Sequence, residues 1–445
     1  MGIKDLIITP ILLIVVYFLA IWKRGDLSDN ITKKYFIPGL TLKIIGAICL
    51  GLVYRYYYQG GDTINYFERG SKFIWEAFLD SPLKAIQLIF ANGSYNANTF
   101  EYASMIIYYH DLPSYFVVRI AGVFDIFTFH TYSATAVLFA VLSFSGIWAM
   151  FMAFYKLFPR LHLQFAIALF FIPSVFFWGS GILKDSVTLG SLGWGTYAFI
   201  QMFILKRRFV SSTILMIISF YVIYQIKIYI LLCFIPALLV WWYLENMKKI
   251  KNIVLKVMIF PVTLIFLLGG GYYSVKLIGE KNRRYSIERL SYTAESTARW
   301  LSYVSERQEG SGYTLGDFDF SSQGILKKAP AAIWVTLFRP YLWEANNLAM
   351  FLSALESLVL LIFTVYTVVM GISRKRFGVS FTNPVVVFCF IYSIIFAFAI
   401  GISTYNFGSL VRYKIPIIPF YIIGLFIWLS YSKRPRKLVL VTSGE

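Results

Sequence analysis

The sequence contains eleven apolar stretches that are each about long enough to cross a lipid bilayer, because a hydrocarbon core of roughly 30 Å needs about 20 apolar helical residues. The stretches lie near residues 5–22, 37–57, 131–157, 164–182, 186–205, 209–226, 228–244, 253–275, 346–371, 382–402 and 410–431. Hydrophobic residues make up 58% of the 445 residues, more than the core of a soluble domain can hold. We therefore expect an all-α, polytopic bundle of transmembrane helices that forms a single integral membrane domain over residues 1–445.

Two neighbouring pairs of apolar stretches are spaced very closely along the chain. One pair meets at residues 182–186 and the other at residues 226–228. Each pair could form one re-entrant hairpin instead of two spans. The sequence therefore predicts about eleven spans, within a range of nine to eleven.

Lys and Arg are concentrated in every second connection between the apolar stretches. The clusters are Lys23, Arg24, Lys33 and Lys34; Lys206, Arg207 and Arg208; Lys248, Lys249 and Lys251; Arg374, Lys375 and Arg376; and Lys433, Arg434, Arg436 and Lys437. Cytoplasmic loops are enriched in these residues. We therefore predict a cytoplasmic C-terminus and, from the odd number of spans, an external N-terminus. Stretch 5–22 lacks a following small-residue cleavage site and is interpreted as a retained anchor.

The three cysteines are Cys49, Cys233 and Cys389, and each lies inside an apolar stretch. They form no CxxC pair and have no ligand-like spacing to the histidines, which argues against a disulfide or a zinc site. This pattern is typical of a bacterial inner (plasma) membrane protein.

Two predicted outer segments are long enough to carry chemistry, residues 58–130 and residues 276–345. In the first external loop, apolar and charged residues are interleaved over 64–79 and over 82–91. Such amphipathic helices lie in the interface of a bilayer. We therefore expect membrane-surface helices in the first external loop, beside the lipid headgroups.

Asp62 directly follows the second apolar stretch, behind Gly60 and Gly61, which let the backbone turn sharply. An Asp before a helical run is a good N-cap, which stabilises the helix by about 1 kcal/mol. A carboxylate that is partly desolvated beside a basic group can also accept a proton from an attacking hydroxyl. The two roles are compatible, so Asp62 is a candidate both for a cap and for a catalytic base.

The second external loop carries more cations than the positive-inside tendency favours outside. They are Lys281, Arg283, Arg284, Arg289, Arg299, Arg307, Lys327, Lys328 and Arg339. Either an anion binds there, or the acidic residues of the loop balance the charge of a solvated segment. The run from Arg339 to Glu344 leads directly into stretch 346–371 and puts a guanidinium at headgroup depth. An interfacial aromatic belt accounts for Tyr341 and Trp343.

Further charged residues lie at the outer ends of apolar stretches, where ionisable groups are costly and mark candidate sites. They are Lys184, Asp185, Lys227, Arg412 and Lys414. Lys184 and Asp185 either belong to a site or neutralise each other. Glu356 lies deeper in its stretch, and we predict structural pairing with an outer cation.

Two short motifs connect these residues with a known family. They are GDTINY at Gly61–Tyr66 and RYKIPIIP at Arg412–Pro419. The first is similar to the acidic motif in the first external loop of the GT-C superfamily of membrane glycosyltransferases. The second resembles the Arg-Tyr-x-x-Pro-x-x-Pro opening of a late span in bacterial members. These enzymes use polyprenyl-phosphate-linked sugars, and the likeness is greatest to bacterial proteins of surface-polysaccharide assembly.

The resemblance implies an inverting transfer at the outer face of the membrane. Asp62 would take the proton of an acceptor hydroxyl while that oxygen displaces the lipid phosphate from the anomeric carbon. The residues expected to bind the substrate are Arg412, Arg339, Lys184, Lys227, Tyr66 and Glu344. The expected partners are a polyprenyl-phosphate-linked sugar, a glycan, lipid or protein acceptor and membrane lipid, with no nucleic acid.

Asp62 lacks the second adjacent acidic residue that many members of the superfamily have. No metal site and no other cofactor are therefore expected. The candidates for a second acid within the loops are Glu68, Glu101 and Asp111.

Two other functions fit the same sequence. An O-antigen or exopolysaccharide polymerase, or another polysaccharide-assembly protein, would show many spans and outer cations, and its catalysis would depend on arginines but not on Asp62. A transporter or non-enzymatic scaffold would instead carry charges near the bilayer midplane and broken helices in paired halves.

Overall fold

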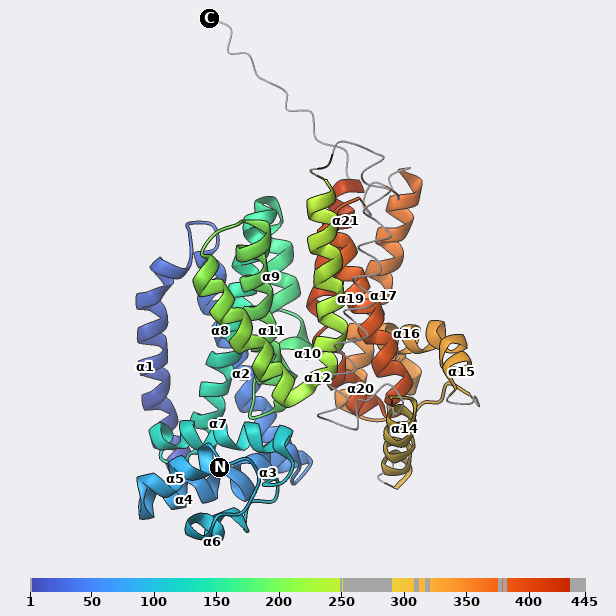
Figure 1. The fold of residues 1–445 in the computed structure, drawn as a ribbon. Coiled ribbons are helices and arrows are strands. Elements are labelled where there is room, and N and C mark those ends of the chain that lie inside the picture. The colour runs from blue at the N-terminus through green and yellow to red at the C-terminus, as the bar shows by residue number, and fades with distance from the viewer. Residues whose placement is uncertain are drawn as a thin grey trace, which may run out of the picture.

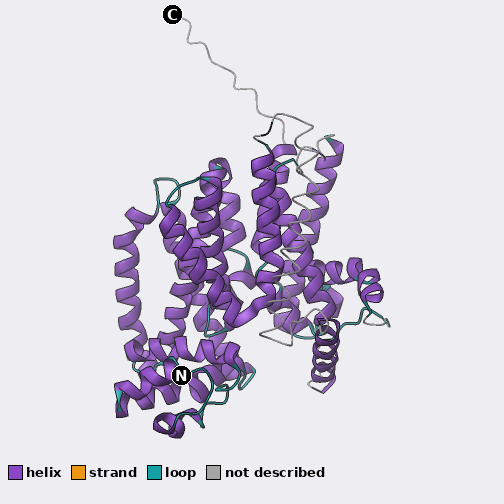
Figure 2. Ribbon diagram, viewed as in Figure 1, coloured by secondary structure: helices purple, strands orange, loops and turns teal. Residues whose placement is uncertain are grey.

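The computed structural model describes residues 2–248, 250, 290–307, 312–316, 321–374, 378 and 382–432. Throughout these residues the ordered elements are helices, and the one extended pairing is an isolated bridge between Gly312 and Asn406 (Figure 2). The helices are α1 (Ile3–Leu27), α2 (Lys33–Leu52), α3 (Asp62–Tyr66), α4 (Lys72–Asp80), α5 (Pro82–Ile89), α6 (Phe100–Ala103), α7 (Leu112–Thr128), α8 (Tyr132–Leu157), α9 (His162–Phe170), α10 (Pro173–Trp178), α11 (Lys184–Phe199), α12 (Phe209–Met247), α14 (Leu290–Arg307), α15 (Ser322–Lys327), α16 (Ala329–Phe338), α17 (Leu348–Ser373), α19 (Pro384–Ser403), α20 (Phe407–Tyr413) and α21 (Ile418–Ser432).

Six of the described helices are long and apolar enough to cross a membrane, or seven if the bent pair of α20 and α21 forms one span. The six are α1, α2 with its π-helical extension to Tyr57, α8, α12, α17 and α19. The chain is therefore an all-α, multi-pass membrane protein. The predicted number of about eleven spans is not confirmed, and stretch 253–275 lies outside the described residues.

Two predicted spans are broken by proline. Stretch 164–182 divides into α9 and the short α10, because Pro173 pushes Ile172 into an extended conformation with ψ 122°. Stretch 410–431 divides into α20 and α21, which meet at an angle of 62° across a break that contains Pro416. Proline has no backbone N–H to continue the helical hydrogen bonds, so an apolar stretch long enough for one span is interrupted there.

α12 is one helix by hydrogen bonding but has two arms. Lys227 interrupts the helix with φ −145° and ψ 72°, and Figure 1 shows the arms meeting there in a sharp bend. The first arm packs on α11 and the second on α19. The bend lies at the junction of the predicted stretches 209–226 and 228–244, one of the two closely spaced pairs.

The long helices form two groups, with the arms of α12 between them. α1, α2, α8, α9 and α11 lie on one side, and α17, α19 and α21 on the other (Figure 1). α8 and α11 pack closely enough that a Cβ on Gly146 would lie 1.9 Å from the Gly190 oxygen, so only glycine fits at that crossing.

The helices of residues 58–130, α3 to α7, lie together across one end of the first group (Figure 1). The amphipathic stretch 64–79 is helical as α3, a π-helical turn (Phe67–Ser71) and α4, and 82–91 contains α5. Their location on a membrane surface stays a prediction. The sequence reasoning did not foresee α7, nor α14, α15 and α16 in the second loop.

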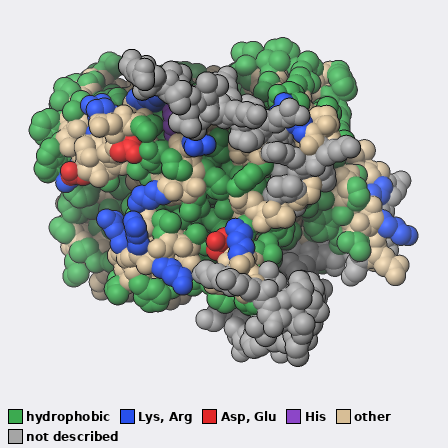
Figure 3. Space-filling view, turned by 90° about the horizontal axis from the view of Figure 1, so that it is seen from above, with side chains coloured by type: hydrophobic (Ala, Val, Ile, Leu, Met, Phe, Trp, Pro, Cys, Tyr) green, Lys and Arg blue, Asp and Glu red, His purple; other side chains and the backbone are tan. Residues whose placement is uncertain are grey.

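The end of the bundle opposite α3 to α7 carries most of the basic clusters that the sequence showed. The described basic residues lie at the last turn of α1, the first turn of α2 and the connection from α11 to α12, with Lys248 just after α12 and Arg374 just after α17. The cluster at 433–437 lies outside the described residues. Figure 3 looks onto this end and shows many Lys and Arg side chains with few acidic ones. The alternation along the sequence therefore corresponds to one face of the bundle, while its assignment to the cytoplasm stays a prediction.

Candidate functional site

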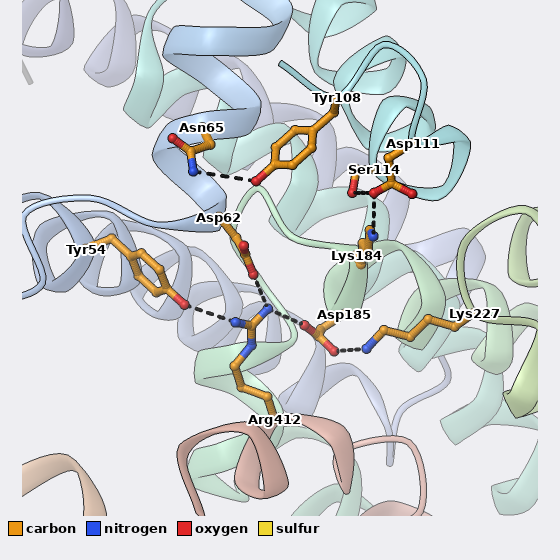
Figure 4. Close-up of polar contacts among 10 residues, drawn as sticks. All are labelled: Tyr54, Asp62, Asn65, Tyr108, Asp111, Ser114, Lys184, Asp185, Lys227 and Arg412. Atoms are coloured by element: carbon orange, nitrogen blue, oxygen red, sulfur yellow. Dashed lines mark hydrogen bonds and ion pairs between the residues drawn. The ribbon is translucent and has the colours of Figure 1, made fainter. Parts of the chain in front are cut away.

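Four segments that are far apart in the sequence meet near the α3 end of the bundle (Figure 4). They contribute Asp62 from the start of α3, Asp185 from the first turn of α11, Lys227 from the bend of α12 and Arg412 from α20. We call these residues, together with Tyr54, Asp111 and Lys184, the Arg412 cluster. All of the positions come from loops or helix ends that the sequence placed on the same side of the membrane.

Arg412 is the centre of the cluster, because its guanidinium contacts three other members. Nη2 donates to Asp62 Oδ2 at 3.0 Å and to Asp185 Oδ2 at 3.2 Å, and Nη1 donates to the Tyr54 hydroxyl at 3.2 Å. The guanidinium carbon lies 5.7 Å from the centroid of the Trp178 ring, within the range of a cation–π contact. Arg412 thus brings two carboxylates of different segments to one positive charge.

The buried half of the cluster is the pair of Asp185 and Lys227. Lys227 Nζ donates to Asp185 Oδ1 at 2.5 Å, and the two side chains are 7% and 2% exposed, respectively. The break in α12 at Lys227 also puts this cation at a helix bend. Taking such charges out of water costs several kcal/mol each, so the ion pair must be kept complete for the fold to be stable.

The Asp185→Asn variant is expected to unfold about 3 kcal/mol more easily than the wild type, because it leaves the buried Lys227 without its carboxylate. Thermal unfolding in detergent would measure the change. Asp80→Asn is the matched control, since Asp80 also pairs with a lysine, Lys84, but at an exposed position. Equal melting temperatures for Asp185→Asn and wild type would contradict the structural role of the pair.

Asp62 forms the exposed half of the cluster, with 41% of its side chain accessible. It is the first residue of α3, and Gly61 occupies the N-cap position with φ 111°. A Cβ on Gly61 would lie 2.8 Å from the Tyr54 ring, so glycine is required there on both counts. The prediction that Asp62 is the N-cap was therefore wrong, and its carboxylate instead bonds to Arg412.

Lys184 and Asp185 do not neutralise each other directly, although they are adjacent in sequence. Neighbouring residues on a helix point in different directions. Lys184 Nζ therefore lies 3.7 Å from Asp111 Oδ2, whereas Asp185 faces Arg412 and Lys227. The Lys184 side chain is 23% exposed and the Asp111 side chain 53%. Lys184 is thus a partly accessible cation, held more loosely than Lys227.

Tyr66 was expected to contact the substrate, but it is only 3% exposed. Burial raises the pKa of Tyr66 well above its ordinary value, and the nearby Asp62 carboxylate adds to this effect. The hydroxyl is therefore protonated at neutral pH. The ring packs against Tyr108, with centroids 5.2 Å apart, which places Tyr66 behind the cluster as support.

Arg339 and Glu344 were both expected to bind substrate, and the structure pairs them with each other. Arg339 Nε donates to Glu344 Oε2 at 3.0 Å, and Nη2 donates to Oε1. The carbonyl oxygen of Arg339 accepts a hydrogen bond from Lys414 Nζ at 3.2 Å. The pair therefore fixes the turn between α16 and α17, and within the described residues the guanidinium is bonded to Glu344 and not to the Arg412 cluster.

The structure also places the three proposed second acids, of which Glu101 is exposed in the first turn of α6. Glu68 lies 3.8 Å from Arg55, and Asp111 pairs with Lys184. The carboxylate that shares a partner with Asp62 is Asp185, on the other side of the Arg412 guanidinium. Within the described residues, no group of three or more His, Cys, Asp or Glu side chains is arranged to hold a metal ion.

Sequence reasoning missed Tyr54 as a member of the site and left Asp185 between two alternatives, a site residue or a partner of Lys184. Tyr54 lies near the end of the predicted stretch 37–57, and its hydroxyl accepts a hydrogen bond from Arg412. The structure pairs Asp185 with Lys227 and Arg412, so Asp185 belongs to the cluster and does not neutralise Lys184. Consecutive residues on a helix point in different directions, and this rule could have shown that Lys184 and Asp185 have different partners.

No protein-family model, no curated protein and no solved structure matches this chain.

Proposed function

We propose that the protein is a membrane glycosyltransferase that moves a sugar from a polyprenyl-phosphate donor to an acceptor hydroxyl, with inversion at the anomeric carbon. The single observation that carries the proposal is Asp62, a half-exposed carboxylate held at the rim of a buried ion-pair network by Arg412. The motifs at Gly61–Tyr66 and Arg412–Pro419, which suggested the GT-C superfamily, supply the two sides of this contact.

The accessible members of the cluster have the charges that such a reaction needs. Asp62, Lys184 and Arg412 have side chains that are 41%, 23% and 18% exposed. Asp185 and Lys227 are buried behind them and balance each other. A donor phosphate can therefore reach one lysine and one arginine beside the carboxylate, while the buried pair keeps Arg412 in place.

The transfer follows from these positions. The acceptor oxygen forms a bond to the anomeric carbon as the bond between that carbon and the phosphate oxygen breaks. Asp62 takes the proton of the acceptor hydroxyl, and the leaving lipid phosphate becomes a dianion. Arg412 and Lys184 stabilise the charge that develops on the phosphate, which is the largest electrostatic contribution available to the reaction. Since Arg412 also contacts Asp62, phosphate binding would loosen that ion pair and free the base.

The position of the basic clusters supports an assignment of the side of the membrane on which this chemistry takes place. We propose that the protein lies in a bacterial inner membrane with the Arg412 cluster on the outer side, because the opposite end carries the Lys and Arg clusters typical of cytoplasmic loops.

The test of this function is transfer of radiolabelled sugar by the purified protein from a panel of polyprenyl-phosphate donors to hydroxyl acceptors. Turnover with at least one donor by the wild type supports the proposal. Failure with every donor would overturn it. Transfer that needs Arg412 but is unaffected by Asp62→Asn would instead favour the polymerase class of enzyme.

Lys184→Met is expected to raise the KM for the donor about tenfold with a smaller change in kcat, because it removes one charge-assisted hydrogen bond to the phosphate. Steady-state transfer kinetics over a range of donor concentrations would measure both constants. Lys84→Met is the matched control, since Lys84 is a lysine of the first loop that pairs with Asp80 outside the cluster. An unchanged donor KM in Lys184→Met would remove Lys184 from phosphate binding.

A further inference from the structure

Two charges that the proposed reaction does not use, a buried lysine and a half-buried glutamate, lie at opposite ends of α10. This six-residue helix joins the two groups of long helices, because it contacts both α2 and α17. At its first turn, Glu356 of α17 accepts hydrogen bonds from Ser174 N at 2.8 Å and Ser174 Oγ at 2.5 Å. Lys414 is close enough to interact electrostatically with Glu356, and the hydrogen bonds of the Glu356 carboxylate within the described residues go to the start of α10.

At the other end of α10, Lys43 of α2 is fully buried. Its Nζ donates to the carbonyl oxygens of Val175 at 3.1 Å and Gly179 at 2.8 Å, and lies 3.3 Å from Ser143 Oγ. Ser143 Oγ itself donates to the Gly179 oxygen at 2.6 Å. Within the described residues, no carboxylate lies within ion-pair distance of Lys43. Lys43 is thus bound by the last carbonyls of α10 and by a serine.

The signs of the two charges match the polarity of the helix. The backbone dipole makes the start of a helix positive and its end negative, so an anion at the start and a cation at the end are both stabilised. Glu356 and Lys43 occupy these two places. The hydrogen bonds at the two ends of α10 offset the cost of removing these charges from water.

α10 leads directly into the Arg412 cluster. After Trp178 the chain runs through the buried residues Ser180, Ile182 and Leu183 to Lys184 and Asp185. A hydrogen bond holds this connection to the first turn of α11, because Ser186 Oγ donates to the Gly181 oxygen at 2.6 Å. A displacement of α10 would therefore move the cluster.

Two further contacts couple α10 to its surroundings. Trp178, the last residue of α10, lies over the Arg412 guanidinium. On the other side α2 touches α10 through backbone, since a Cβ on Gly46 would lie 2.2 Å from the Phe176 oxygen. The helix has no room to shift while these contacts and its two terminal charges remain.

We propose that Lys43 and Glu356 are positioning residues that hold α10 at both ends and thereby place Asp185, Lys184 and Trp178 around Arg412. The positioning of α10 stands on the contacts alone, and only its effect on turnover rests on the proposed function. The two residues act through α10 and touch no substrate.

Hydrogen exchange followed by mass spectrometry tests the proposal in the full-length protein. Lys43→Met and Glu356→Gln are expected to speed amide exchange about tenfold or more in residues 174–186, because each removes charge-assisted bonds at one end of α10. Exchange in α19, which lies in the other part of the bundle, should stay as in the wild type. Ile45→Met is the matched control, a substitution on α2 at a side that faces outward.

The transfer assay supplies the second measurement. If the wild type is active, both variants should lose about 10²-fold in kcat with little change in donor KM, as displaced catalytic groups do. Unchanged exchange in residues 174–186 of both variants would overturn the proposal, and so would equally faster exchange in every helix. If exchange in this segment responds but the wild type transfers no sugar, the positioning of α10 stands and the proposed glycosyl transfer fails.

Discussion

Arg412→Ala is expected to lower kcat/KM for sugar transfer about 10³-fold. Removal of one preorganised donor to developing charge typically costs 10²–10³ in rate. Arg412 has a second function in the same site, because it holds Asp62 and Asp185 on one guanidinium. Its loss therefore removes phosphate stabilisation and the placement of the base together.

The same variant should also be less stable, by about 2 kcal/mol, because bonds to charged groups contribute about 1.5–3 kcal/mol. The loss is limited because Asp185 keeps Lys227, and Asp62 is open to water. Transfer kinetics and thermal unfolding in detergent would measure the two effects separately. Arg55→Ala is the matched control, since Arg55 pairs with Glu68 at an exposed position outside the cluster. Wild-type activity in Arg412→Ala would contradict the proposed site.

Asp62→Asn is expected to lower kcat by about 10²–10⁴-fold, the range that a general base contributes. Asparagine has the same shape as aspartate but cannot accept the proton of the acceptor hydroxyl. The KM for the donor should change little, because the donor phosphate is bound by Arg412 and Lys184. Steady-state kinetics with saturating acceptor would measure this.

The folding of Asp62→Asn should stay close to that of the wild type, since 41% of the side chain is exposed and Gly61 supplies the N-cap. Thermal unfolding in detergent is the control for this point. A loss of activity that accompanies a large fall in melting temperature would be a folding effect and would contradict the assignment of Asp62 as the base.

The fold could be predicted from the sequence where a long apolar run has no proline beyond the first helical position, which Pro384 occupies in α19. Stretches 131–157 and 382–402 correspond closely to α8 and α19. Hydropathy is a sum over a window, so it records whether a segment suits lipid but not whether its backbone stays helical. It therefore missed the break before Pro173, and with it the short helix α10.

The sequence could predict which residues belong to the site better than it could predict which of them contact one another. Asp62, Lys184, Lys227 and Arg412 were all candidates because charge at the end of an apolar stretch is costly. The sequence placed them on one side of the bundle, and the structure brings them together. Which cation pairs with which carboxylate depends on side-chain direction across four separate segments, and this information is not local.

Arg339 shows the opposite case. Its depth and charge suggested phosphate binding, but Glu344, five residues further along, occupies the guanidinium through two parallel hydrogen bonds. The residue in between, Tyr341, donates its backbone N–H to the same carboxylate at 2.8 Å. A tight local turn thus pairs the Arg339 guanidinium, which the sequence alone suggested was available to bind a phosphate.

The most direct test of the proposed function compares two aspartates that each pair with a cation of the Arg412 cluster. Asp62 pairs with Arg412, whereas Asp111 pairs with Lys184, and both side chains are accessible. The measurement is the kcat of radiolabelled sugar transfer from a polyprenyl-phosphate donor for the wild type, Asp62→Asn and Asp111→Asn. We expect Asp62→Asn to lose at least about 10²-fold in kcat, with Asp111→Asn close to the wild type. Equal activity of Asp62→Asn and wild type would contradict the assignment of Asp62 as the catalytic base and, with it, the proposed reaction.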